Sequence, residues 1–101
     1  MKTHLISGGC GFVGRNLVKR LFKNTQDRIL FIDNLSVGKH PSEWLDISLK
    51  KTVGILEIYG EDERLCFIEE DFRVTLNKLV DQPGYLKNDL GLDIEKFTDV
   101  Y

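Results

Sequence analysis

The sequence predicts an α/β fold built on a parallel β-sheet, and three features near its start carry this prediction. A short apolar segment at residues 3–7 runs into a glycine-rich stretch, SGGCGFVG, at residues 7–14. A segment with helical spacing follows at residues 12–23, and a second apolar segment lies at residues 28–33. A strand, a glycine turn, a helix and a strand within about 30 residues form the βαβ unit of a parallel sheet.

Each of these elements has its own signal. Residues 3–7 are stopped by glycine, as is typical of a buried strand. The helix at residues 12–23 has one apolar face and a basic end that suits the helix dipole. A polar turn at residues 24–27 then leads into a second buried strand at residues 28–33. The apolar positions of the helix are Val13, Leu17, Val18, Leu21 and Phe22.

The next part of the chain allows two interpretations. Residues 34–40 form a loop, after which Ser42 is placed to cap a helix that begins near Glu43. Helical spacing continues to residue 56, but residues 53–59 also fit a strand, and the pattern does not decide between them. The positions with helical spacing are Leu45, Leu49, Val53 and Leu56.

The remaining residues predict three short elements. A third strand covers residues 65–68, and a short helix at residues 76–80 stops before the Pro-Gly pair at residues 83–84. Residues 97–101 begin a fourth strand.

Composition excludes several classes of protein. The chain has 101 residues, of which 42% are hydrophobic and 30% charged, with a formal net charge of −2, so no basic surface for nucleic acid is expected. No apolar run approaches the roughly 20 residues that span a bilayer, and the N-terminal apolar stretch is too short for a signal peptide. The two cysteines lack metal-ligand spacing. We therefore expect a cytoplasmic protein that binds neither nucleic acid, nor membrane, nor metal.

The glycine stretch predicts a dinucleotide-binding turn. A turn from a buried strand into a helix gathers backbone N–H groups at the positive end of the helix dipole, where side chains would keep a phosphate away. Gly9-x-Gly11-x-x-Gly14 fits the dinucleotide fingerprint, although a glycine turn that serves packing alone is the alternative. Asp33 follows Gly14 by about 20 residues, the position of the acidic residue that holds the ribose hydroxyls.

The acidic residue at position 33 also favours NAD over NADP, because a carboxylate repels a 2′-phosphate. Two basic residues favour NADP instead, because the side chain of Arg15 or of Lys39 could reach such a phosphate. Cys10 lies at a helix N-terminus, where thiol pKa values fall, but it has no basic partner and is expected to be a small packing residue.

Three motifs together resemble a known family. They are SGGCGFVG at residues 7–14, Asn-Leu-Val at residues 16–18, and FIDNLSVG at residues 31–38. The chain from residue 2 to about residue 73 resembles the extended short-chain dehydrogenase/reductase family, within it the NAD-dependent sugar-nucleotide epimerases and dehydratases. The resemblance implies a Rossmann-like doubly wound parallel sheet, of which this chain carries the first three to four strands.

The resemblance also implies a cofactor site. The family's three glycines match Gly8, Gly11 and Gly14, while Asp71 and Phe72 match an aspartate and an adenine-contacting residue after the third strand. Phe12 and Val13 are expected to offer N–H groups to the pyrophosphate while their side chains pack inward. The full set of expected cofactor-binding residues is Gly8, Gly11, Phe12, Val13, Gly14, Asp33, Asn34, Ser36, Gly38, Asp71 and Phe72.

The chain departs from the family in its catalytic pattern. Tyr-x-x-x-Lys is absent, because Tyr59 and Tyr85 are followed four residues later by Glu63 and Asp89, and Tyr101 is last. We expect no catalytic residue in residues 1–101, which correspond to the amino-terminal, NAD-binding part of a longer enzyme. By resemblance that enzyme acts on a nucleotide sugar as a homodimer. The alternatives are a non-catalytic NAD(P)-sensing module and a flavin-dependent oxidoreductase.

Overall fold

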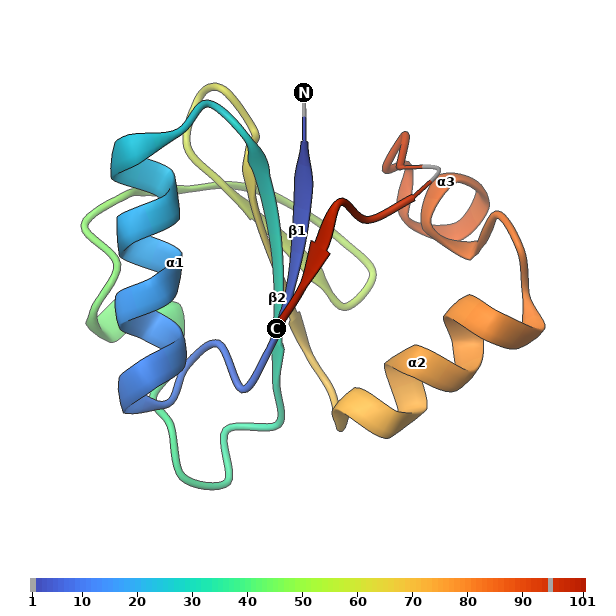
Figure 1. The fold of residues 1–101 in the computed structure, drawn as a ribbon, viewed down its shortest axis with the longest axis horizontal. Coiled ribbons are helices and arrows are strands. Elements are labelled where there is room, and N and C mark those ends of the chain that lie inside the picture. Colours follow the sequence, from blue (N-terminus) through green and yellow to red (C-terminus); the bar gives the residue numbers. More distant parts are fainter. Residues whose placement is uncertain (1, 95) are drawn as a thin grey trace.

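The computed structural model describes residues 2–94 and 96–101 and shows a mixed α/β fold (Figure 1). The elements, in chain order, are β1 (Thr3–Ser7), α1 (Phe12–Asn24), β2 (Arg28–Asp33), a 3₁₀ turn η1 (Pro41–Glu43), β3 (Leu49–Val53), β4 (Leu56–Tyr59), β5 (Leu65–Glu69), α2 (Phe72–Asp81), α3 (Tyr85–Leu90) and β6 (Asp99–Val100). The βαβ unit predicted at the start of the chain is confirmed. The third strand, the helix before the Pro-Gly pair and the last strand are also present as β5, α2 and β6.

The sheet has six strands in the order β3-β4-β5-β2-β1-β6. β5, β2, β1 and β6 are parallel neighbours. The sheet is larger than predicted, because β3 and β4 add two antiparallel strands beside β5. Its mostly parallel topology is consistent with a Rossmann-like fold.

Helices cover both faces of the sheet. In Figure 1, α1 lies on one side of the strands, and α2 and α3 lie on the other. Successive residues of β2 point to opposite faces, so Ile29 and Phe31 pack in the core under α1, while Leu30 and Ile32 pack in the core under α3. This two-sided burial explains why the parallel strands are continuous apolar runs rather than alternating ones.

The segment between β2 and β5 corrects one prediction and decides another. No α-helix begins near Glu43; η1 is a single 3₁₀ turn, and its cap is His40, whose side chain accepts the Ser42 N–H. Residues 49–59 form a β-hairpin, so the helical interpretation is wrong and the strand interpretation holds for β4. The hairpin turns at Gly54, whose φ of 59° favours glycine.

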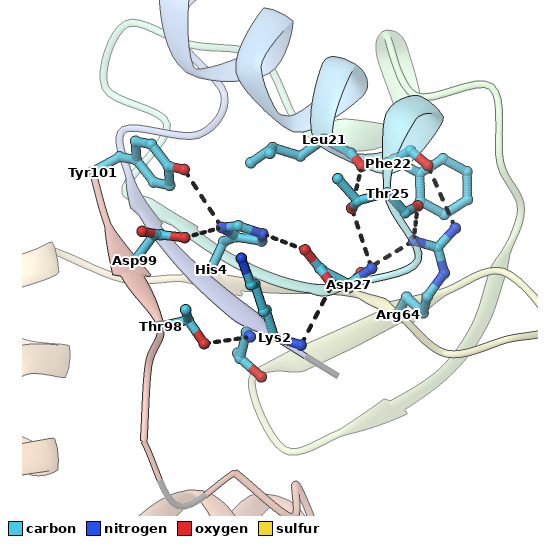
Figure 2. Close-up of polar contacts among 11 residues, drawn as sticks. Lys2, His4, Leu21, Phe22, Thr25, Asp27, Arg64, Thr98, Asp99 and Tyr101 are labelled. Carbon is cyan, nitrogen blue, oxygen red and sulfur yellow. Dashed lines mark hydrogen bonds and ion pairs between the residues drawn. The ribbon is translucent and has the colours of Figure 1, made fainter.

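A cluster of polar groups around the buried side chains of His4 and Arg64 joins the starts of the strands (Figure 2). His4 Nε2 lies 2.9 Å from Asp27 Oδ2, and His4 Nδ1 lies 3.3 Å from Asp99 Oδ2. The buried Arg64 guanidinium donates hydrogen bonds to the carbonyl oxygens of Thr25 and Asp27, at 3.1 and 3.0 Å. These contacts tie β1, β2, β5 and β6 together at the edge opposite the glycine turn.

No helix in the described part of the chain is both long and apolar enough to cross a membrane.

Candidate functional site

The glycine turn connects the end of β1 to the start of α1. The N–H groups of Gly8 and Gly9 donate to the Ile32 carbonyl of β2, at 2.8 and 3.3 Å, and so fix the turn to the sheet. α1 begins after Gly11 with no side-chain cap and no acidic residue in its first turn. The first N–H groups of a helix have no intrahelical partner, so this end of α1 keeps donors available beside its positive dipole end.

The glycines of this turn serve different purposes. Gly8 has a φ of 66°, and a Cβ on Gly9 would lie 2.6 Å from Phe31 Cβ. A Cβ on Gly14 would overlap the Gly8 carbonyl oxygen, so α1 approaches the turn this closely only because residue 14 is glycine. Gly11 is different: its φ is −74°, and a Cβ there would meet only the Gly8 oxygen, at 3.5 Å. Close packing therefore accounts for Gly9 and Gly14, and the left-handed backbone accounts for Gly8, but neither accounts for Gly11.

Phe12 and Val13 correct a further prediction. Their side chains do not pack inward: Phe12 is 72% exposed and Val13 is 78% exposed. α1 contacts the turn through Gly14, and this helix orientation directs the two preceding side chains away from the sheet. The buried face of α1 accordingly begins with Leu17 and Val18.

Asp33 lies at the end of β2 and joins the turn to the following loop. Its Oδ2 accepts the Cys10 N–H at 3.0 Å, and its Oδ1 accepts the Leu35 N–H at 2.8 Å. The Asn34 side chain accepts the Ser36 N–H at 3.0 Å. Asp33 is therefore oriented by two backbone groups, and its carboxylate lies beside the glycine turn, where the fingerprint places the ribose ligand.

A small open pocket of about 160 Å³ lies at the carboxyl ends of β1, β2 and β5. It gathers five of the eleven expected cofactor-binding residues from three segments of the chain. The residues that line it are Gly8, Ile32, Asp33, Asn34, Asp71 and Phe72. Ligands of open α/β sheets bind at this edge of the strands.

The other expected residues lie in two segments of the chain that adjoin residues of this pocket in sequence. Gly11, Phe12, Val13 and Gly14 belong to the turn and the first turn of α1, while Ser36 and Gly38 lie in the loop after β2. They do not line the pocket themselves.

Two ionisable groups near this site, Asp71 and Cys10, have pKa values that differ from their ordinary ones. Asp71 caps α2 by accepting the Arg73 N–H at 2.8 Å, and its hydrogen bonds with the Arg73 guanidinium lower the pKa of the Asp71 carboxyl. Burial, with a further contribution from Asp33, raises the pKa of the Cys10 thiol to about 12. Cys10 therefore stays protonated near neutral pH, which agrees with a packing role rather than a nucleophilic one.

One polar group near this site was not predicted from the sequence. Glu57 of β4 lies 2.8 Å from His40, at the end of the loop that carries Ser36 and Gly38. No sequence motif contains Glu57, because its position depends on the register of the hairpin.

Comparison with known proteins gives one short match. A segment of 44 residues is 43% identical to the dTDP-glucose 4,6-dehydratase of Salmonella typhimurium. The segment makes up 44% of this chain and 12% of the dehydratase. No protein-family model matches the chain, and no solved structure matches it. The match supports the resemblance inferred from the sequence, over less than half of the chain.

Proposed function

We propose that this chain binds NAD, and that it is the cofactor-binding part of an enzyme that dehydrates or epimerises a nucleotide sugar. The observation that carries the proposal is Gly11. The fold has no packing need for glycine there, yet a side chain at this position would project over the uncapped start of α1. A pyrophosphate that approaches these N–H groups explains why the position is kept clear.

The adenosine half of NAD is proposed to bind beside the turn. Asp33 would accept hydrogen bonds from the ribose hydroxyls, with Asn34, Ser36 and Gly38 in the adjoining loop. The pocket lined by Asp71 and Phe72 would receive the adenine. The Asp33 carboxylate repels a 2′-phosphate, and so favours NAD over NADP.

Bound NAD would supply the acceptor and donor of hydride, and this chain would supply its placement. The sequence holds no Tyr-x-x-x-Lys, so we propose that the acid-base groups and the sugar-binding site come from outside these 101 residues, in a homodimeric protein. The name of the matched dehydratase supports a nucleotide-sugar substrate. The missing catalytic pattern also supports a second candidate, an NAD-sensing module that uses the same site without catalysis.

Isothermal titration of the 101-residue chain with NAD, NADP and FAD tests the binding site. We expect NAD to bind more tightly than NADP, and we expect Gly11→Val to abolish NAD binding while the helix content measured by circular dichroism is kept. Unchanged NAD affinity in Gly11→Val would mean that no ligand requires glycine at this position. Equal or tighter NADP binding would contradict the role of Asp33, and preferential FAD binding would favour the flavin alternative.

Turnover assays separate the two candidate functions. The 101-residue chain alone should not convert nucleotide sugars such as dTDP-glucose. A longer natural protein that contains this chain should convert one. Asp33→Asn should raise its KM for added NAD, and Asp81→Asn, at an exposed position, is the matched control. A longer protein that binds NAD without turnover of any nucleotide sugar would support the sensing module instead.

A further inference from the structure

The loop at residues 34–40, named here the ribose loop, needs contacts with the rest of the protein to keep its shape. It contains no helix or strand, and Leu35 within it has a φ of 61°. A left-handed conformation is unfavourable for a bulky residue, and it persists only where surrounding contacts impose it. At its start the loop is held by Asp33, which accepts the Leu35 N–H.

At its end the ribose loop is held by His40. The Nδ1 atom of His40 accepts the Ser42 N–H at 3.1 Å, so the ring hydrogen lies on Nε2 when the imidazole is neutral. That Nε2–H donates to Glu57 Oε1 at 2.8 Å. The imidazole also stands edge-on to the Phe67 ring, with the ring centroids 5.7 Å apart.

Glu57 is itself fixed by its neighbour on β4. Tyr59 lies two residues along the strand, on the same face, and its hydroxyl donates to the same Glu57 oxygen at 2.7 Å. Burial raises the pKa of Tyr59, which keeps this hydroxyl protonated and donating. The Tyr59 residue is 2% exposed, so the partly exposed Glu57 side chain is held by a group anchored in the core.

The ribose loop in turn contacts the glycine turn. A Cβ on Gly38 would lie 2.5 Å from the Cys10 carbonyl oxygen, so the loop backbone packs directly on the turn. The Cys10 N–H donates to Asp33. A continuous path of contacts therefore runs from the antiparallel hairpin to the residues proposed to bind the pyrophosphate and ribose.

We infer that Glu57 is a positioning residue for dinucleotide binding, which acts through its hydrogen bond to His40 and sets the ribose loop against the glycine turn. The inference rests on the proposed NAD site. It gives the β3–β4 hairpin a role in the function of the parallel half of the sheet. Glu57 touches no ligand itself, so its effect should appear in NAD affinity and depend on His40.

A double-mutant cycle on NAD affinity tests this inference, with Kd measured by isothermal titration. Glu57→Leu and His40→Ala should each weaken NAD binding about fivefold, the size expected for loss of one hydrogen bond, and the double variant should weaken it no further. Glu57→Gln should bind nearly as the wild type, because its amide oxygen can accept from both His40 and Tyr59. Glu61→Leu is the matched control, since the Glu61 side chain is 98% exposed in the turn that follows β4.

Each outcome decides the inference. Unchanged affinity in Glu57→Leu, losses that multiply in the double variant, or no rescue by Glu57→Gln would overturn it while leaving the NAD site standing. If Glu57→Leu does not fold, the comparison of His40→Ala with Glu57→Gln decides, and equal NAD affinity in His40→Ala and wild type would overturn the inference. A wild-type chain that does not bind NAD would overturn the proposed function and this inference with it.

Discussion

Two alanine substitutions in the glycine turn should separate its packing role from its binding role. In Gly14→Ala the new methyl would overlap the Gly8 carbonyl oxygen and lie 2.8 Å from both Gly8 C and Gly9 Cα. These neighbours are backbone atoms fixed to β2, so relief requires α1 to move. Such overpacking costs about 3 kcal/mol at the upper end of its usual range, against about 1 kcal/mol gained by replacing a helical glycine with alanine. We expect Gly14→Ala to be destabilised by about 2 kcal/mol.

Gly11→Ala should leave stability nearly unchanged. Its methyl would meet only the Gly8 oxygen at 3.5 Å, and the backbone is already in a conformation that alanine adopts. Replacing glycine with alanine reduces the conformational entropy of the unfolded chain, which stabilises the fold by about 0.4–1 kcal/mol. Alanine is also a poorer residue for capping a helix, which costs about 1 kcal/mol and offsets this gain. NAD binding should nevertheless weaken, because the methyl enters the space kept for the pyrophosphate.

Urea unfolding of both variants, followed by circular dichroism, measures the two free energies directly. The expected loss in Gly14→Ala corresponds to a fall in Tm of roughly 8–16 °C for a domain of this size. A Gly14→Ala variant as stable as the wild type would refute the packing argument. A Gly11→Ala variant as unstable as Gly14→Ala would remove the main support for a ligand at the turn.

Three further outcomes follow from the polar and ionisable groups. Asp33→Ala should weaken NAD binding by about 1–3 kcal/mol in a titration, because charged hydrogen bonds to the ribose are lost. The hydrogen bond from His4 lowers the pKa of Asp27, so this carboxylate stabilises the fold above its ordinary pKa and the stabilisation is lost as the pH falls through the lowered value. The free energy of unfolding should therefore drop below about pH 4, and it should drop less in Asp27→Asn, as urea titrations across pH would show. Burial raises the pKa of both Cys10 and Cys66 to about 12, so a thiol reagent at pH 8 should modify them only after unfolding, and rapid modification of the folded chain would contradict their burial.

The parallel half of the fold could be predicted because its signals are local. A strand buried on both faces is a continuous apolar run, and the run at residues 28–33 has this form. The glycine turn and Asp33 lie at fixed spacings from these runs, so their positions in the sequence follow from the same local signals. In the structure Gly8, Asp33 and Asp71 line one pocket.

The hairpin could not be settled from the sequence because strand pairing and register are tertiary contacts, which the apolar spacing of one segment does not determine. β4 pairs with β5 in antiparallel register, with Leu56 opposite Ile68, and no local pattern encodes that pairing. The helical spacing of this segment was a coincidence of residues from different elements: Leu45 and Leu56 are buried, whereas Leu49 of β3 is 48% exposed. The role of Glu57 depends on the same register and was equally hidden.

α3 was missed although a signal was available. Gly84 and Gly91 flank it, and both adopt the left-handed conformation that caps this helix. Glycines at both ends of a six-residue segment are typical of a short helix but also of a loop. The apolar residues of α3 contact the sheet only through tertiary packing.

The pairing of β1 with β6 has a consequence for the order in which the chain folds. β1 lies between β2 and β6, and its pairing with β6 joins residues 95 apart, such as His4 and Asp99. Closing so long a loop costs more chain entropy than joining β1 to β2, so the latter contact is favoured to form first. On a ribosome, β1 acquires its β2 partner early, but the backbone of Leu5 stays half-paired until Tyr101 has emerged to donate to its carbonyl. Pairing on both sides of β1 is thus completed only after β6 has been made.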